Sequence, residues 1–234
     1  MSSFQALKEE AWQANQELPR RGVVLYTFGN VSAIDRKQGV FAIKPSGVPY
    51  ESLKIDDMVV VDLECRIAEG HLKPSSDTRT HAVLYRRFSG IGGIVHTHST
   101  HATAWSQAGR PIPVYGTTHA DHLAVDVPCT KVMTDDAIHG DYEEETGNQI
   151  ITAFQSLNPA EVEMVLVSGH GPFTWGKTAM KAVYNAVILE ELAKMAWITE
   201  QVNGKTPRLK QTLIDKHYFR KHGKDAYYGQ NETK

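Results

Sequence analysis

The sequence predicts an α/β fold built as one domain. Three features of its 234 residues carry this prediction. Short runs rich in valine and isoleucine, separated by turn residues, indicate strands of a sheet. Longer segments in which apolar residues recur every three or four positions indicate helices. No linker, internal repeat or low-complexity tract divides the chain, and the mixed order of helices and strands leaves the strand pairing open.

The first third of the chain begins with a helix and continues as strands. Residues 4–18 carry apolar side chains at helical spacing, and Pro19 closes this segment. Three short apolar runs then predict strands at residues 23–25, 40–43 and 58–63. We expect these strands to belong to one sheet, because only turn residues separate them.

The middle of the chain alternates helices and buried strands. Residues 77–87 predict a helix with Asp77 near its N-cap, where an acidic side chain accepts hydrogen bonds from free backbone amides. A buried strand is predicted at residues 92–98, and a helix at residues 99–107 starts directly after it. Another apolar run predicts a strand at residues 162–167.

The last third of the chain is predicted to be mostly helical. Residues 177–202 form one long periodic segment with many alanine and leucine residues. Residues 207–222 predict a second, more polar helix that leads into an irregular tail.

Composition and charge exclude several classes of protein. The chain is 41% hydrophobic and 22% charged, as is usual for a globular protein. A formal net charge of −2 argues against a surface for nucleic acid or anionic membranes. No apolar run approaches the roughly 18 residues of a membrane span, and the N-terminus lacks the apolar core of a signal peptide. The two cysteines, Cys65 and Cys129, predict no disulfide framework, and we expect a cytoplasmic protein.

A pair of histidines in a predicted strand carries the strongest chemical signal. His96 and His98 are two residues apart, so their side chains leave the same face of a strand and can reach one metal ion. Such a pair also occurs without any metal. A third histidine, His170, lies between two glycines directly after another predicted strand, as a site with close backbone approach requires. Asp77 is either a fourth ligand or only a helix cap.

Five motifs and the C-terminal tail resemble a known family. They are similar to the class II aldolase/adducin-like family and, within it, to the pentulose-phosphate 4-epimerases, from roughly residue 5 to residue 230. The aldolase members do not share the tail. The matching strings are IKPSG (43–47), KPSSDT (73–78), GGIVHTHS (92–99), GTTHAD (116–121), HGPFTWG (170–176) and the tail with its AYYGQ segment (216–230).

This resemblance implies a fold, a reaction and a cofactor. The fold is a three-layer α/β/α domain over residues 1–230, with a central mixed, largely antiparallel sheet and a C-terminal extension at 231–234. The implied epimerase interconverts L-ribulose 5-phosphate and D-xylulose 5-phosphate in pentose catabolism of the arabinose or ascorbate type. C4 of these sugars carries no acidic proton, so the reaction proceeds by retro-aldol cleavage and re-formation of the C3–C4 bond. Zn²⁺, or another divalent ion such as Mn²⁺ or Co²⁺, is held by the residues matching Asp77, His96, His98 and His170.

The resemblance also implies two acid/base residues and an oligomer. Proton transfer at the C4 hydroxyl from opposite sides needs two groups, which match Asp121 and Tyr228. Both need a pKa tuned by burial or by neighbouring charge. The tail with Tyr228 reaches a neighbouring subunit in the family, and His217 lies near that interface. The implied partners are therefore further copies of the chain, in a homotetramer with active sites between subunits.

Substrate phosphate is implied to bind small residues and backbone amides. Glycine and hydroxyl side chains allow several donors to converge on a dianion, and Lys44 adds positive charge. Thr117, Thr118 and Glu143 are weaker candidates for supporting roles. The implied phosphate-binding residues are Gly29, Asn30, Lys44, Ser46, Gly47, Ser75 and Ser76.

Two other functions fit parts of the same pattern. Class II aldolases share the metal site, but they usually carry glutamate at the position of Asp77 and lack the tail. Adducin-like binding domains lack the metal histidines, which this chain retains. His122 after Asp121, and Phe28 before Gly29, depart from the usual family residues and leave the choice of sugar phosphate open.

Overall fold

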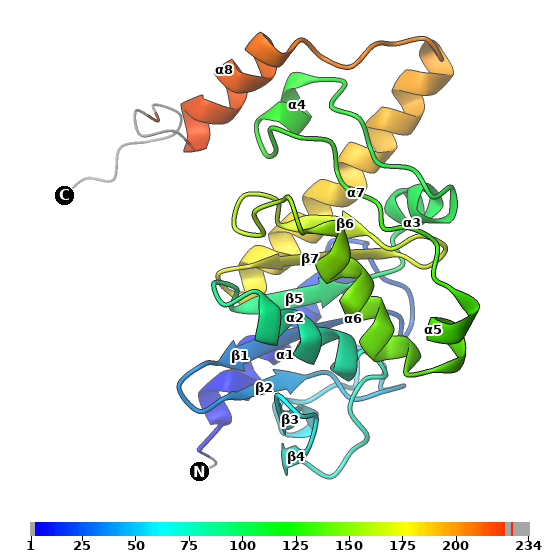
Figure 1. Ribbon diagram of the computed structural model, residues 1–234. Helices are drawn as coiled ribbons and strands as arrows, with labels where there is room; N and C mark the ends of the chain where they lie inside the picture. Colours follow the sequence, from blue (N-terminus) through cyan, green and yellow to red (C-terminus); the bar gives the residue numbers. More distant parts are fainter. Residues whose placement is uncertain (1–2, 223–225, 227–234) are drawn as a thin grey trace, which may run out of the picture.

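The computed structural model of the chain describes residues 3–222 and residue 226. Its centre is a seven-stranded sheet in the order β4-β3-β2-β1-β5-β7-β6 (Figure 1). Every ladder between neighbouring strands is antiparallel among the described residues, so the sheet is antiparallel throughout where a mixed, largely antiparallel one was predicted. The strands are β1 (Asn30–Asp35), β2 (Val40–Ile43), β3 (Val59–Asp62), β4 (Ile67–Glu69), β5 (Gly93–His96), β6 (Met164–Leu166) and β7 (Pro172–Gly176).

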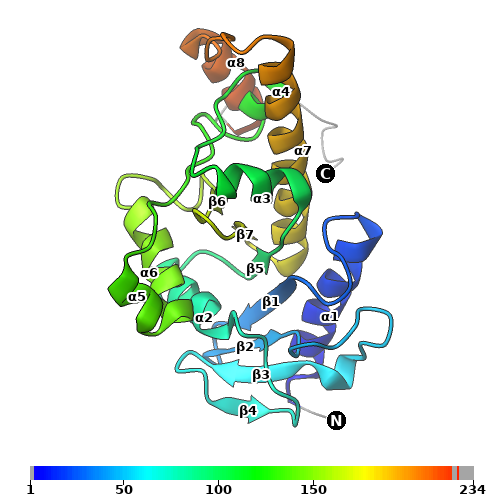
Figure 2. The same cartoon turned by 90° about the vertical axis from the view of Figure 1, so that its right-hand side faces the viewer.

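Helices cover both faces of the sheet, which confirms the predicted three-layer α/β/α arrangement. α1 and the N-terminal part of α7 pack on one face, and α2 and α6 lie on the other (Figure 2). The helices are α1 (Gln5–Arg20), η1 (Ile55–Asp57), α2 (Thr78–Arg87), α3 (Thr100–Gln107), α4 (Thr117–Ala120), α5 (Asp135–His139), α6 (Tyr142–Ala153), α7 (Ala179–Val202) and α8 (Gln211–His222).

Two hydrophobic cores follow from the alternation of side chains along each strand. In β2, Phe41 and Ile43 belong to the core beneath α2 and α6, whereas Val40 and Ala42 pack against α1. All four side chains are buried. A strand buried on both faces reads as a continuous apolar run, which is why this one was predictable.

Two predictions for the first third of the chain are wrong. Residues 23–25 form no strand, and Tyr26 directly after them has a positive φ of 52°. The strand in this region is instead β1. Its Asn30 and Ser32 side chains bond to Asp77 and His81, so these polar residues interrupt the apolar pattern that indicates a strand. Pro19 does not end the first helix, because α1 continues to Arg20.

The register of β1 on β5 brings polar residues from distant parts of the sequence side by side. Asn30 lies opposite His96, at the end of both strands. On the other side of β5, His96 lies opposite Phe173 of β7. The ends of three neighbouring strands therefore meet at one end of the sheet, where β1 and β5 carry the polar residues Asn30 and His96.

A separate arm lies at the far end of α7. α4 and α8 pack against each other there, away from the strands, in both views (Figures 1 and 2). Val114, Ala120 and Ile214 form a small hydrophobic core of their own between them. Within the part of the chain that the structure describes, no helix is long and apolar enough to cross a membrane. The predicted extension, residues 231–234, lies outside the described residues.

Candidate metal centre and substrate pocket

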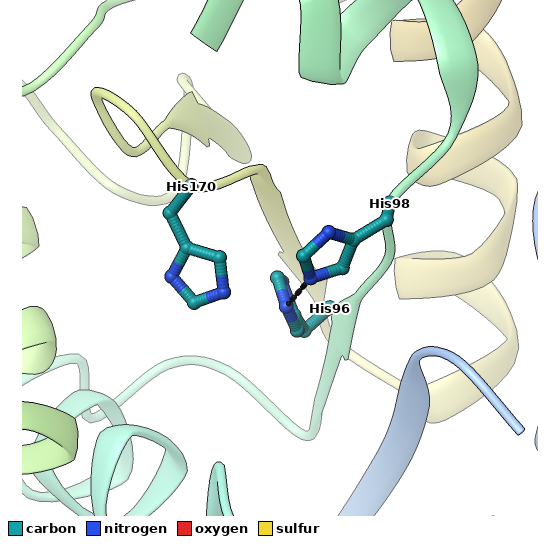
Figure 3. A group of neighbouring side chains, drawn as sticks. All are labelled: His96, His98 and His170. Carbon is teal, nitrogen blue, oxygen red and sulfur yellow. Dashed lines mark hydrogen bonds between the residues drawn. The ribbon is translucent and has the colours of Figure 1, made fainter. Parts of the chain in front are cut away.

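Three histidines converge at the end of the sheet where β5 finishes and β7 begins. His96 ends β5, His98 follows it by two residues, and His170 lies in the turn before β7 (Figure 3). One ring nitrogen from each lies within 4.8 Å of the others. The predicted grouping of these residues is therefore confirmed, and three imidazoles at this spacing can ligate a single divalent cation.

Hydrogen bonds at Nδ1 of His96 and His170 orient these two rings as metal ligands. His96 Nδ1–H donates to the Pro172 carbonyl oxygen at 3.0 Å, which leaves Nε2 without a proton and able to accept a hydrogen bond from His98 Nε2, 3.1 Å away. His170 Nδ1 lies 3.3 Å from the Tyr142 hydroxyl, so a proton on Nδ1 leaves Nε2 free. Burial lowers the pKa of His170 to about 4 and also lowers that of His98. Two of the rings are thus neutral at pH 7, as metal ligation requires.

Tyr142 is a site residue that sequence reasoning missed. It is the first residue of α6 and is followed by three glutamates, a pattern that indicates only an acidic helix start. Its hydroxyl reaches His170 because α6 packs beside α2. No periodicity or spacing in the sequence could have linked two residues 28 positions apart.

Glycines allow the backbone to approach the histidines closely. A Cβ atom at Gly171 would lie 2.9 Å from the Thr97 carbonyl oxygen and 3.4 Å from His96 Cε1. A Cβ at Gly29 would lie 2.8 Å from the His96 carbonyl oxygen, and this residue also has a positive φ of 76°. Both sites are closed to larger side chains by backbone atoms.

We therefore expect Gly171→Ala to weaken metal binding about 10-fold or more, because the added methyl group displaces His96 or the strand that carries it. The affinity is measured by competition with a chromogenic chelator. Gly90→Ala is the matched control, since a Cβ there meets nothing within 4 Å. Equal zinc affinity of the two variants would contradict this account of Gly171.

Asp77 lies beside the three histidines rather than capping α2. It occupies the N-cap position, but its side chain makes no capping hydrogen bond. Instead, Asn30 Nδ2 donates to Asp77 Oδ2 at 2.6 Å. Burial alone would raise the pKa of Asp77, but the neighbouring His96 and His81 and the Asn30 amide hold it below its usual value. Among the described residues, the close cluster of ligand atoms contains the three histidines and not this carboxylate.

The histidines form one wall of a polar pocket of about 430 Å³. Lys44 lies at this pocket with only 2% of its surface exposed, and its Nζ is 4.9 Å from the centre of the Tyr50 ring. Burial lowers the pKa of Lys44 to about 8. All predicted metal and phosphate residues meet here, since the lining consists of Thr27, Phe28, Gly29, Asn30, Lys44, Pro45, Ser46, Gly47, Ser75, Ser76, Asp77, His96, His98 and His170.

The predicted acid/base residue Asp121 does not line this pocket. It is the C-cap of α4 in the distal arm, where Arg220 donates to both carboxylate oxygens at 2.8 and 2.7 Å. His217 Nδ1 and Lys221 Nζ also contact the carboxylate, at 2.9 and 3.4 Å. Partial burial would raise the pKa of Asp121, but hydrogen bonds from Arg220 and His217 lower it to about 2. Charged neighbours are present, but they move the pKa of Asp121 away from neutrality, so the tuning expected of an acid/base group is not seen in the single chain.

The remaining predicted residues divide between the two regions. Thr117 and Thr118 belong to α4, and His217 to α8, so all three lie in the distal arm. Glu143 is in the first turn of α6, next to Tyr142, and its carbonyl oxygen accepts a hydrogen bond from Thr80. Tyr228 lies outside the described residues.

The fold and the histidine cluster define the class of this protein. A sequence profile of the family described as the class II aldolase and adducin N-terminal domain matches residues 9–197. The chain belongs to this family. An L-fuculose 1-phosphate aldolase has the same fold, with a TM-score of 0.76 and 24% identity over 93% of this chain and 95% of its own. YgbL from Klebsiella pneumoniae, a putative aldolase/epimerase/decarboxylase, aligns with a TM-score of 0.72 and 26% identity over 92% and 99% of the two chains.

Two sequence relatives are more similar to this chain than these structures are. L-ribulose-5-phosphate 4-epimerase UlaF from Salmonella paratyphi C (strain RKS4594) is 53% identical to this chain over 227 residues, which are 97% of this chain and all of the relative. The protein of the same name from Salmonella paratyphi A (strain ATCC 9150 / SARB42) is 52% identical over the same length. The resemblance inferred from the motifs is therefore confirmed.

Proposed function

We propose that this chain is a metal-dependent L-ribulose-5-phosphate 4-epimerase that forms D-xylulose 5-phosphate. The observation that carries the proposal is the joint pocket, in which three converging imidazoles face Lys44 and a group of serines and glycines. The first part suits a divalent cation, and the second suits a phosphate group. The identity of about half of all residues with epimerases along nearly the whole chain supports this substrate.

The residues of the pocket fit a bound cation and its chemistry. His96, His98 and His170 would hold the ion, with Asp77 beside them as a proposed fourth ligand. Zinc suits three neutral imidazoles and a carboxylate, and Mn²⁺ or Co²⁺ are alternatives. When bound, the ion supplies Lewis-acid stabilisation of the negative charge that cleavage of the C3–C4 bond places on the substrate.

The rest of the pocket orients the sugar phosphate. Gly29 and Gly47 both have positive φ and expose their backbone, and the hydroxyl groups of Ser46, Ser75 and Ser76 lie around the same cavity. Lys44 adds a positive charge that burial strengthens toward a dianion. With the phosphate held at one end, the C2 and C3 oxygens would lie toward the histidines.

We expect Lys44→Met to raise KM by about 10- to 100-fold, because it removes one charged hydrogen bond to the phosphate. In the unmodified enzyme, kcat/KM should also fall as the pH rises above about 8, since the charged form of Lys44 binds substrate and is lost there. Steady-state kinetics of both proteins between pH 6 and about 9.5 test this. An unchanged KM, or the same alkaline fall in Lys44→Met, would exclude Lys44 from phosphate binding.

The site requires a second copy of the chain. Asp121 and His217 lie in the arm of α4 and α8, away from the pocket of their own chain. A neighbouring copy could bring this arm over the pocket. We therefore propose a homotetramer whose active sites lie between subunits, with Asp121 and Tyr228 as the two acid/base residues. A cytoplasmic role in arabinose- or ascorbate-type pentose catabolism belongs to the same proposal.

A coupled assay tests the function directly. Purified protein loaded with zinc is given L-ribulose 5-phosphate, and D-xylulose 5-phosphate is measured with and without a chelator. The proposal expects turnover that the chelator abolishes and that added zinc restores. Metal-loaded, folded protein that releases a two-carbon aldehyde phosphate instead would be an aldolase, and protein with neither activity would overturn the proposal.

A further inference from the structure

A chain of buried polar groups lies behind the metal pocket, between β1 and α2. Tyr85 Oη is 2.7 Å from Ser32 Oγ, and Ser32 Oγ is 2.7 Å from His81 Nδ1. The three side chains are at most 1% exposed. None of them lines the pocket or belongs to the residues proposed to hold metal or substrate.

The direction of the two hydrogen bonds determines where His81 carries its proton. If Tyr85 donates to Ser32 and Ser32 donates to His81 Nδ1, both hydroxyl protons are used and the ring proton is on Nε2. In the reverse direction, the Tyr85 proton has no acceptor in the part of the chain that is described. A buried hydroxyl rarely leaves its proton unused, so the Nε2–H form of His81 is favoured.

That Nε2–H is a buried donor without a hydrogen-bond partner among the described residues. Asp77 precedes His81 by one turn of α2, and the His81 amide donates to the Asp77 carbonyl oxygen at 3.0 Å, so the two side chains leave neighbouring positions on one face of the helix. Asn30, which donates to Asp77 from the other side, has a buried Oδ1 that is also without a partner. Two of the four unpartnered buried side-chain atoms among the described residues thus belong to Asn30, which contacts Asp77, and to His81, one turn after it.

The unpartnered His81 donor, one turn after Asp77, suggests a role for His81 when the site holds a metal ion. Ligands of a metal ion are usually held by a further hydrogen-bonding group, and loss of that group commonly weakens metal binding 10- to 100-fold. His96 and His170 have such groups in the Pro172 carbonyl and the Tyr142 hydroxyl. Asp77 has Asn30 as one such group, and the unpartnered Nε2–H of His81, one turn further along α2, is the candidate for a second.

We propose that His81 is a positioning residue of the metal centre, whose unpartnered Nε2–H donates to the Asp77 carboxylate when that carboxylate ligates the ion. The Ser32 hydroxyl holds His81 in the form that carries this proton. The inference rests on the proposed metal centre, and it adds a layer of residues that contact neither metal nor substrate.

Zinc affinity of the purified full-length protein, measured by competition with a chromogenic chelator, tests this inference. The amide nitrogen of glutamine lies near the position of Nε2, whereas that of asparagine lies near Nδ1. We expect His81→Asn to bind zinc about 10- to 100-fold more weakly and His81→Gln to restore most of the affinity. Ser32→Ala frees the ring proton to move to Nδ1 and should weaken zinc binding in the same direction.

Tyr85→Phe is the matched control. It removes a buried hydrogen bond but leaves the Ser32 hydroxyl free to donate to His81, so it should lower the melting temperature of the metal-free protein and leave zinc affinity near that of wild type. A merely structural role would lower the melting temperature in all four variants without a matching change in zinc affinity. The absorption spectrum of the cobalt-loaded protein reports the ligand geometry independently.

The outcomes separate the two proposals. Wild-type protein that binds no zinc overturns the metal centre and this inference together. Zinc-binding wild type with unchanged affinity in His81→Asn and Ser32→Ala overturns only the role of His81. Equal weakening in His81→Asn and His81→Gln also overturns it, because the distal donor is then not what matters. If His81→Asn does not fold, Ser32→Ala and His81→Gln still decide the question.

Discussion

Replacing His96 with asparagine is expected to abolish bound metal and turnover together while the chain stays folded. The His96 ring lies at the centre of the three histidines, with ring centroids 4.8 and 4.7 Å from those of His98 and His170. Its removal should lower metal affinity by more than about 100-fold, since loss of a group that only supports a ligand already costs 10- to 100-fold. Asparagine fills less space than histidine but remains polar, so the sheet around it should persist.

Metal content by elemental analysis, turnover and the melting temperature of the metal-free protein are measured on the same sample. His139→Asn is the matched control, because among the described residues this ring bonds to the Asp135 carbonyl oxygen of its own helix and takes no part in the histidine cluster. Wild-type turnover in a metal-free His96→Asn protein would remove the metal from the mechanism. A metal-free variant that does not fold would instead assign the ion a structural role.

Replacing Asp121 with asparagine is expected to retain the metal and to lose most epimerisation, by about 10²- to 10⁴-fold in kcat. The carboxylate contacts Arg220, His217 and Lys221, and it does not line the histidine pocket of its own chain. An amide cannot take up a proton from the C4 hydroxyl, but it leaves the ligands untouched. Hydrogen bonds from Arg220 and His217 lower the pKa of Asp121 to about 2, so its carboxylate is ionised at neutral pH and can accept a proton.

Asp126→Asn is the control for loss of charge in the same arm, since Asp126 also binds an arginine, Arg208, at 2.8 Å. It should destabilise the arm to a similar extent and retain turnover. Mixed oligomers give a second measurement. If active sites combine the pocket of one chain with Asp121 of another, random reassembly of His96→Asn with Asp121→Asn chains should restore roughly a quarter of the sites. No restored activity would place both groups in the same chain.

The sequence predicted the elements whose apolar pattern is simple. β2, β3 and β5 are continuous buried runs, and α7 has a long helical period. β1 was missed because Asn30 and Ser32 face polar partners in α2 and its N-terminal loop, which interrupts the apolar pattern. β7 begins with proline and ends with glycine, both of which usually indicate turns, although four backbone pairs join it to β5.

The site was predicted in part from spacing and in part from resemblance. Spacing alone paired His96 with His98, because the two lie on one face of a strand. The addition of His170 and Asp77 depended on strand order, which side-chain patterns do not determine. Tyr142 and His81 could not be predicted, since each acts through one contact that depends on how α6 and α2 pack. That Asp121 lies outside the pocket could not be predicted either, because it depends on how α4 is placed relative to the sheet.

The edges of the sheet restrict how copies of this chain can associate. Both outer strands, β4 and β6, have only three residues. At the β6 edge, the backbone of Leu166 is already bonded to Pro128 and Thr130. Such edges leave few free backbone groups for another strand to pair with. The chain is thus protected against the edge-to-edge growth that leads to fibrous aggregates, and ordered assembly falls to its helices and loops.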